Sequence, residues 1–143
     1  MKFGGTSVGS AKRMRDVLKI LNRSSEQKMV VLSAMAGTTN ALVEITKELR
    51  EHKIDRATSM LDTLKQHYEQ ICQELFTDQE QYLLQGLGIV EEVFAYLKER
   101  TALSLRRNVS NEVLAQGEIL STSLIKSSAG NKADFCPSDL TKM

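Results

Sequence analysis

The chain has 143 residues, of which 41% are hydrophobic and 26% are charged, and its formal net charge is +1. This size and balance are typical of one soluble globular domain, and they exclude a disordered tail and a strongly basic nucleic-acid-binding protein. No apolar run reaches the roughly 18 residues of a membrane span, and no signal-peptide pattern opens the chain, so we expect a cytoplasmic protein without a membrane partner.

The chain opens with a glycine- and serine-rich loop that leads into a helix. Lys2 stands beside this loop, which runs from Gly4 to Ser10. Ser10 can cap a helix whose apolar residues recur at helical spacing from Met14 to Leu21. Glycines let backbone N–H groups approach a phosphate, so a phosphate site and an ordinary strand-to-helix turn both fit the pattern. The excess of Lys and Arg near the N-terminus likewise fits an anionic ligand or solvated helix faces.

A short apolar run rich in β-branched residues follows, Met29 to Leu32. It predicts a strand buried on both faces, as in a parallel sheet. Ser33 to Asn40 comes next, at the carboxyl end of that strand, which is the edge where open α/β sheets bind ligands. Its hydroxyl and amide groups suit a small polar substrate. Helix capping by Thr39 or Asn40 explains the same residues without a ligand.

The middle of the chain is predominantly helical. Apolar stripes predict one helix that begins at Asn40 and carries apolar residues from Leu42 to Leu49, and a longer one over Ala57 to Leu75. Thr77-Asp78-Gln79-Glu80 is typical of a capping box that opens a third helix. Gly86 and Gly88 lie inside this third helix and predict a bend or a close helix contact there. We assign the apolar stripes to core packing.

Ser110 can cap a last helix that stops at Gly130, and Ala133 to Cys136 then predicts a short strand ended by Pro137. Glu118 lies inside that helix among apolar neighbours, where a carboxylate needs a partner. Solvent, a structural ion pair or the ammonium group of an amino-acid substrate would each serve.

Strands separated by helices favour an α/β fold with an incomplete parallel sheet and a predominantly helical middle region. Two or three short strands are few for so many helices, which indicates further strands in residues outside the chain or in a partner subunit. Cys72 and Cys136 have neither CxxC spacing nor a His cluster, so we expect buried, reduced thiols and no zinc site.

Three segments taken in order carry a more specific pattern. They are Lys2-Phe3-Gly4-Gly5-Thr6-Ser7-Val8, Val30-Val31-Leu32-Ser33-Ala34-Met35-Ala36-Gly37-Thr38-Thr39-Asn40 and Gln116-Gly117-Glu118-Ile119-Leu120-Ser121-Thr122. Together they resemble the N-terminal half of aspartate kinases of the amino acid kinase family. The opening segment matches neither the P-loop pattern nor the dinucleotide-binding pattern, whereas KFGGTSV is specific to this family.

The resemblance implies ATP-dependent phosphorylation of the side-chain carboxylate of L-aspartate to 4-phospho-L-aspartate, with Mg²⁺, as the first step toward lysine, threonine and methionine. By motif match, Lys2 would be catalytic and would stabilise the transferring phosphoryl group. The residues implied at the phosphate of ATP are Lys2, Gly4, Gly5 and Ser7. The residues implied at aspartate are Ser33, Thr39 and Glu118, and no metal ligand is implied.

The chain departs from the family at both ends. Family members usually have several residues before KFGG, and an acidic-Ala-Arg type sequence where this chain reads Cys136 to Met143. We therefore expect residues 1–143 to form the N-terminal portion of an amino acid kinase catalytic domain, without the nucleotide-binding half and the ACT domains, and to be inactive alone. The alternatives are a non-catalytic oligomerising fragment such as a homodimer, half of a split kinase that pairs with a separate C-terminal half, and a related kinase acting on glutamate, acetylglutamate or a nucleotide.

Overall fold

The structure of the protein is a computed structural model, and it describes residues 1–23, 26, 29–77, 79–103 and 110–129. Within them the chain is mostly helical, with a small parallel sheet, as the sequence predicts. The elements in chain order are β1 (Lys2–Phe3), α1 (Ala11–Leu21), β2 (Val31–Leu32), α2 (Thr38–Arg50), α3 (Ile54–Leu75), α4 (Glu80–Leu103) and α5 (Ser110–Ala129).

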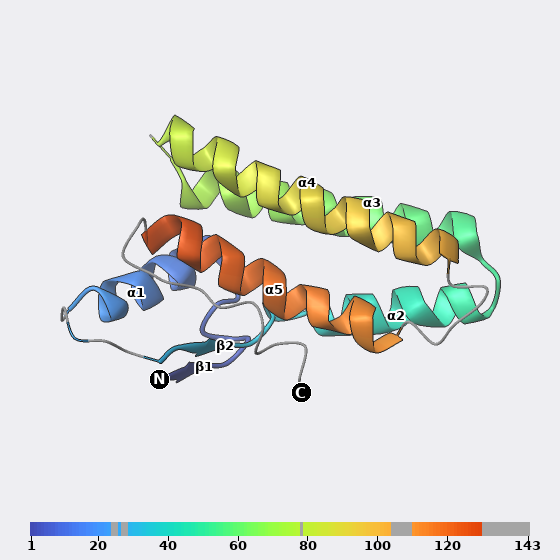
Figure 1. The fold of residues 1–143 in the computed structure, drawn as a ribbon, viewed down its shortest axis with the longest axis horizontal. Coiled ribbons are helices and arrows are strands. Elements are labelled where there is room, and N and C mark those ends of the chain that lie inside the picture. Colours follow the sequence, from blue (N-terminus) through green and yellow to red (C-terminus); the bar gives the residue numbers. More distant parts are fainter. Residues whose placement is uncertain (24–25, 27–28, 78, 104–109, 130–143) are drawn as a thin grey trace.

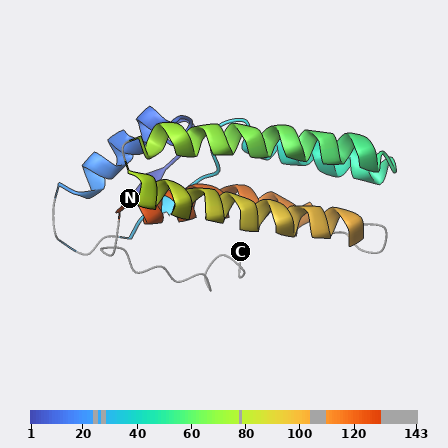
Figure 2. The ribbon, with the colours of Figure 1, turned by 90° about the horizontal axis from the view of Figure 1, so that it is seen from above.

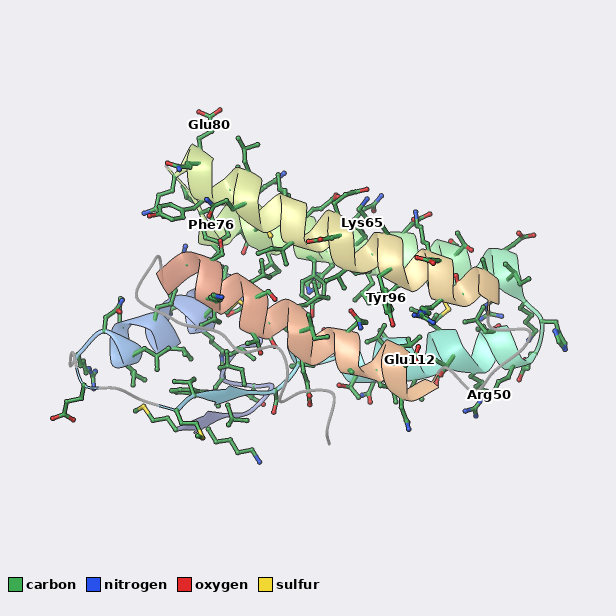
Figure 3. All side chains as sticks on the ribbon, in the orientation of Figure 1. Arg50, Lys65, Phe76, Glu80, Tyr96 and Glu112 are labelled. Atoms are coloured by element: carbon green, nitrogen blue, oxygen red, sulfur yellow. The ribbon has the colours of Figure 1, made fainter. Side chains whose placement is uncertain are left out.

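Four of the helices form a two-layer bundle, in which α3 and α4 lie over α2 and α5 (Figures 1 and 2). Each of these helices packs against two others, in the cyclic order α2, α3, α4, α5. Because α2 and α5 are antiparallel, Arg50 and Glu112 lie at the same end of the molecule (Figure 3). The apolar stripes predicted from the sequence face the interior of this bundle, where Leu61, Tyr68 and Phe94 are fully buried.

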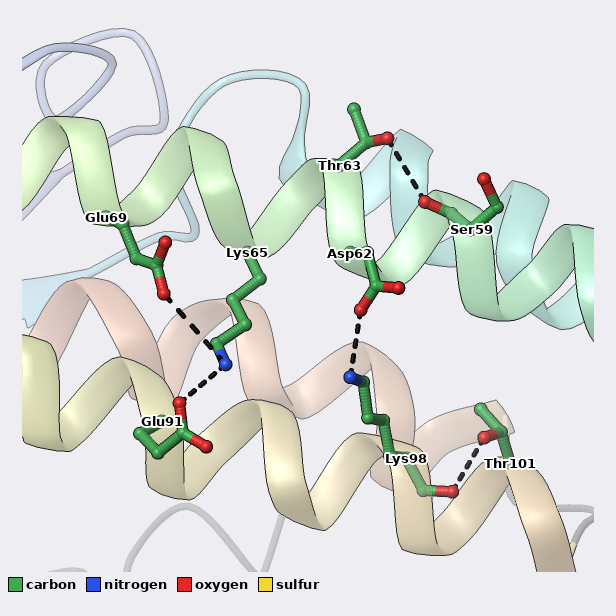
Figure 4. A network of polar contacts seen from close by, with 8 residues as sticks. All are labelled: Ser59, Asp62, Thr63, Lys65, Glu69, Glu91, Lys98 and Thr101. Carbon is green, nitrogen blue, oxygen red and sulfur yellow. Dashed lines mark hydrogen bonds and ion pairs between the residues drawn. The ribbon is translucent and has the colours of Figure 1, made fainter.

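Ion pairs cross the exposed side of the α3–α4 hairpin (Figure 4). Lys65 Nζ lies 2.5 Å from a carboxylate oxygen of Glu91, and Lys98 Nζ lies 2.9 Å from one of Asp62. The hydrogen bond between the first pair raises the pKa of Lys65 and lowers the pKa of Glu91. Since solvent screens such pairs, we assign them to the register of the two helices rather than to the stability of the fold.

Gly86 lets α4 approach the end of α3. A Cβ atom at Gly86 would lie 2.6 Å from a ring carbon of Phe76 and 3.4 Å from the sulfur of Cys72. At Gly88 the same atom would meet nothing within 4 Å. The close helix contact that the sequence predicts for these glycines is therefore confirmed at Gly86.

The capping box predicted for α4 is wrong. α4 begins at Glu80, and the hydroxyl of Thr77 donates to the carbonyls of Gln73 and Glu74, at 3.1 and 3.0 Å. Thr77 therefore stabilises the end of α3. A threonine between two helices can bond to either one, and the spacing of Thr77 and Glu80 does not decide between them.

The sheet is small and covered on one side. β1 and β2 pair in parallel, with Lys2 opposite Val31 and Phe3 opposite Leu32. β2 packs against α5, and Leu32 is 8% exposed, but Val31 is 48% exposed. The predicted incomplete parallel sheet is confirmed, whereas burial of this strand on both faces is wrong, because the described helices cover the face that carries Leu32 and leave Val31 exposed.

The remaining expectations concern the two cysteines, the C-terminal segment and membrane-spanning helices. Cys72 is fully buried, and its burial raises the pKa of the thiol to about 11. Cys136, the predicted strand at Ala133 to Cys136 and the predicted helix stop at Gly130 lie outside the described residues. Among the helices that the structure describes, none combines the length and the apolar character needed to cross a bilayer.

Candidate functional site

The opening loop, Gly4 to Ser10, forms a compact turn between β1 and α1. The amide of Ser7 donates to the carbonyl of Gly4 at 3.0 Å, and the guanidinium of Arg13 donates to the carbonyl of Thr6 at 3.0 Å. The side chain of Ser10 accepts from the amide of Arg13 at 3.2 Å and caps α1, as predicted. The loop therefore stands at the N-terminus of a helix, where the partial charge favours anions.

The second loop, Ser33 to Gly37, leads into α2 through a glycine N-cap instead of a side-chain cap. Gly37 has φ 85°, a left-handed conformation that glycine adopts without a steric penalty, and it is the N-cap residue of α2. The amide of Thr38 donates to the carbonyl of Met35 at 3.0 Å. The alternative that Thr39 or Asn40 caps the helix is thus wrong, and both residues are exposed in its first turn.

Gly5 brings the two loops together. The amide of Ala36 donates to the carbonyl of Gly5 at 3.1 Å, and the amide of Ser33 donates to the carbonyl of Phe3 at 3.0 Å. A Cβ atom at Gly5 would lie 2.8 Å from the backbone oxygen of Ala34, closer than a real contact allows. The two loops therefore share one edge, at the carboxyl ends of the two parallel strands.

Gly117 brings α5 against the second loop from the other side. A Cβ atom at Gly117 would lie 2.9 Å from the Cβ of Ala34 and 3.1 Å from the methyl carbon of Thr38. One turn later, the buried hydroxyl of Ser121 donates to the carbonyl of Ser33 at 2.7 Å. Glu118 follows Gly117 directly, so it lies at the border of this contact, with its side chain exposed.

The structure thus brings together the three segments that carry the predicted site residues. On the strand and the opening loop, Lys2, Gly4 and Ser7 are exposed and Gly5 is half-buried. On the other two segments, Ser33 is half-buried, while Thr39 and Glu118 are exposed. The hydrogen bonds described above join these segments through backbone groups and Ser121.

Sequence reasoning missed the residues that place Glu118, namely Gly117 and Ser121. A signal was available, because glycine inside a helix costs about 1 kcal/mol relative to alanine and, in an otherwise regular helix, indicates a packing reason. The partner of Gly117 was not predictable, since Ala34 and Thr38 are far away in the sequence. The hydrogen bond of Thr38 to α3, described below, was missed for the same reason.

The site combines two kinds of group. Lys2 and Arg13 are exposed cations beside the opening loop, and the N-termini of α1 and α2 face the shared edge of the two loops. Hydroxyl groups stand on the second loop and in the first turn of α2, at Ser33 and Thr39, and the carboxylate of Glu118 stands on α5. Such an arrangement suits a small molecule with both carboxylates and an ammonium group beside a phosphate. Within the described part of the chain, no group of three or more His, Cys, Asp or Glu could hold a metal ion.

The chain is similar to known proteins over most of its length. Residues 1–141 match the amino acid kinase family. Aspartokinase 1, chloroplastic, of Arabidopsis thaliana is 33% identical over 125 residues, which are 85% of this chain and 21% of that protein. The aspartokinase of Chlamydia muridarum is 32% identical over 126 residues, 87% of this chain and 25% of that protein.

A solved structure agrees as well. The crystal structure of E. coli aspartokinase III in complex with aspartate and ADP superposes with a TM-score of 0.52 at 26% identity, over 89% of this chain and 27% of that chain. The present chain thus spans between 21% and 27% of the length of these three relatives. The resemblance read from the three sequence segments is confirmed, and the chain belongs to the amino acid kinase family.

Proposed function

We propose that this chain supplies the substrate-side part of an aspartate kinase, which transfers the γ-phosphoryl group of ATP to the side-chain carboxylate of L-aspartate. The product is 4-phospho-L-aspartate, at the first step toward lysine, threonine and methionine. One observation carries the proposal: Gly5 and Gly117 pack the opening loop and the turn of Glu118 onto the second loop from two sides. The relatives in sequence are named aspartokinases, and one relative in structure was solved with aspartate and ADP.

In this proposal aspartate lies over the second loop. The hydroxyls of Ser33 and Thr39 offer hydrogen bonds to its carboxylates. Glu118 offers a negative charge and acceptor oxygens to its ammonium group, a charge-assisted contact that a substrate without the amine would lack. Glu118 is exposed and one residue from the Gly117 contact, so it reaches the substrate without being desolvated in the free protein.

Lys2 and the opening loop take the phosphate side. Lys2 is the catalytic residue that offsets charge on the transferring phosphoryl group, with the backbone of Gly4 and Gly5 and the hydroxyl of Ser7 beside it. The substrate carboxylate attacks the γ-phosphorus directly, so no nucleophile of the protein is needed. Catalysis then consists of aligning two anions and offsetting their repulsion, which suits a basic, glycine-rich edge.

The proposal includes the dependence of this chain on other parts of the kinase. The chain spans between 21% and 27% of the length of the three relatives, and in this proposal the groups that hold adenine, ribose and Mg²⁺ lie outside these residues. We therefore propose that the chain alone has no useful kinase activity, that it acts in the cytoplasm, and that it works with a C-terminal half or as a homodimer. A coupled assay of the purified chain with ATP, Mg²⁺ and aspartate tests this, and normal turnover would refute it.

A binding titration tests the substrate. The purified chain is titrated with L-aspartate, L-glutamate and acetylglutamate by calorimetry. We expect saturable binding of aspartate, weaker binding of glutamate, and loss of aspartate binding in Glu118→Gln. Glu92→Gln is the matched control, since Glu92 is exposed on α4, outside the site. Preference for glutamate or acetylglutamate would favour the related kinases, and a folded chain that binds none of the three would contradict the proposal.

A further inference from the structure

One buried polar contact links the proposed site to the core of the helix bundle. The hydroxyl oxygens of Thr38 and Tyr68 lie 2.6 Å apart. Thr38 is 2% exposed and Tyr68 is 0% exposed. Thr38 is the first residue of α2 and directly precedes Thr39, a proposed aspartate ligand. Tyr68 lies in α3, so the bond joins the entrance of α2 to a helix that carries none of the proposed site residues.

Tyr68 lies in an apolar environment, where its hydroxyl would destabilise the folded state if it had no hydrogen bond. The Tyr68 ring packs in the apolar core, 6.1 Å from the ring of Phe94. An unpaired buried hydroxyl destabilises the folded state, whereas phenylalanine would fill nearly the same volume without that cost. Burial raises the pKa of Tyr68 to about 12, so the group keeps its proton at neutral pH and the bond persists. Packing alone therefore does not account for a tyrosine at this position.

Thr38 connects three parts of the structure. Its hydroxyl bonds to Tyr68 in α3, its amide closes the second loop on the carbonyl of Met35, and its methyl carbon lies 3.1 Å from the Cβ position of Gly117 in α5. Thr38 thus directly precedes Thr39 in the chain and contacts Gly117, the residue before Glu118. A rotation of the first turn of α2 would change the distance between Thr39 and Glu118, the two proposed aspartate ligands.

We propose that Tyr68 is a positioning residue of the aspartate site. Its hydroxyl fixes the first turn of α2 through Thr38, and so sets the hydroxyl of Thr39 relative to the carboxylate of Glu118. Tyr68 does not touch the substrate. The inference rests on the proposed function for the identity of the ligand, but the fixing of the turn stands on the contacts of Thr38 alone.

The first experiment needs no ligand. Amide hydrogen exchange is measured by NMR in the wild-type chain, in Tyr68→Phe and in Tyr82→Phe, a matched control whose ring is 37% exposed. Tyr68→Phe is expected to speed exchange of the amides of Thr38 and Ala36 by about tenfold, and that of α4 amides much less. Tyr82→Phe is expected to leave both loop amides unchanged. No change in Tyr68→Phe, or equal acceleration in all helices, would overturn the proposal.

The second experiment separates positioning from stability. The double variant Thr38→Val/Tyr68→Phe removes both hydroxyls, so no buried group is left unpaired and the urea midpoint is expected to return close to the wild-type value. The affinity of this double variant for aspartate is expected to be about fivefold or more below that of the wild type, because no hydrogen bond holds the first turn of α2. Recovery of affinity together with stability would show a merely structural bond. Thr46→Val is the control, since that buried hydroxyl bonds within α2 to Val43.

The two readouts distinguish the failure of this proposal from the failure of the proposed function. If the wild-type chain does not bind aspartate, the ligand assignment fails, while the exchange of the Thr38 amide still decides whether Tyr68 fixes the turn. If the wild-type chain binds aspartate and Tyr68→Phe changes neither exchange nor affinity, the function stands and the positioning role is wrong.

Discussion

Ser121 donates a hydrogen bond of 2.7 Å to the backbone carbonyl of Ser33, which lies 88 residues earlier in the chain. The same buried hydroxyl lies 3.2 Å from the carbonyl of Glu118 in its own helix. One side chain thus joins the turn of α5 that bears Glu118 to the second loop, beside Ser33. This contact joins two of the segments that carry proposed site residues, although they lie far apart in the sequence.

Ser121→Ala is expected to weaken that site. Loss of the bond leaves the carbonyl of Ser33 unpaired, so we expect the free energy of unfolding to fall by about 1 kcal/mol and aspartate affinity to fall several-fold. Urea denaturation and titration measure the two effects. Ser128→Ala is the matched control, because the hydroxyl of Ser128 bonds within α5 to Leu124. Equal losses of affinity in both variants would contradict the role of Ser121.

Gly117→Ala tests the close approach of α5. The added methyl group would lie 2.9 Å from the Cβ of Ala34, so α5 must move away from the second loop, and we expect a loss of about 1–3 kcal/mol. Gly88→Ala is the control within α4, where the methyl group meets nothing within 4 Å and helix propensity favours alanine by about 1 kcal/mol. Opposite signs in urea denaturation are therefore expected. Stabilisation of both variants would show that the Gly117 contact is not close.

Alkaline pH is expected to destabilise the protein through two buried groups. The pKa of Cys72 rises from 9.0 to about 11, and that of Tyr68 from 10.0 to about 12, both by burial. As pH rises, the unfolded chain loses these protons at a lower pH than the folded chain does. The two groups therefore leave the free energy of unfolding unchanged below pH 9. They lower it as pH rises, Cys72 between pH 9 and 11 and Tyr68 between pH 10 and 12. Each group contributes a slope of up to about 1.4 kcal/mol per pH unit.

Urea denaturation between pH 8 and pH 11.5 measures this dependence. Tyr68→Phe is expected to flatten the fall above pH 10, and Cys72→Ala the fall that begins near pH 9. Lysines titrate in the same range, so the comparison with each variant, rather than the wild-type curve, isolates the group. Curves that stay parallel to the wild type in both variants would contradict the burial of these two groups.

Local signals in the sequence were sufficient to predict that the helices exist, but not to predict where α2 and α4 begin. Ser10 caps α1 as predicted, because a cap depends on residues three positions apart. The exposure of Val31 was not predictable in this way, since it depends on which distant elements cover the sheet. The helix start at Gly37 was missed for a local reason, because the left-handed glycine made the neighbouring hydroxyls unnecessary as caps.

The expectation that these residues converge on one site came from the family resemblance and not from periodicity. Composition and spacing placed Ser33 at a strand end and Glu118 on a helix, but nothing in either pattern brings two residues so far apart in sequence together. Gly117 and Ser121 bring these two segments together, and Gly5 joins the opening loop to the second loop. Contacts of this kind are fixed by tertiary packing, which single-sequence patterns do not encode.

Substitutions of the two adjacent glycines, Gly4 and Gly5, test the contact between the opening loop and the second loop. A methyl group on Gly5 would lie 2.8 Å from the backbone oxygen of Ala34, and a backbone atom cannot rotate aside, so Gly5→Ala must push the opening loop off the second loop. On Gly4 the methyl group meets nothing within 4 Å. We expect Gly5→Ala to cost about 1–3 kcal/mol and most of the aspartate affinity, and Gly4→Ala to change stability by less than about 0.5 kcal/mol. If both variants bind aspartate like the wild type, contact between the two loops is not what forms the site.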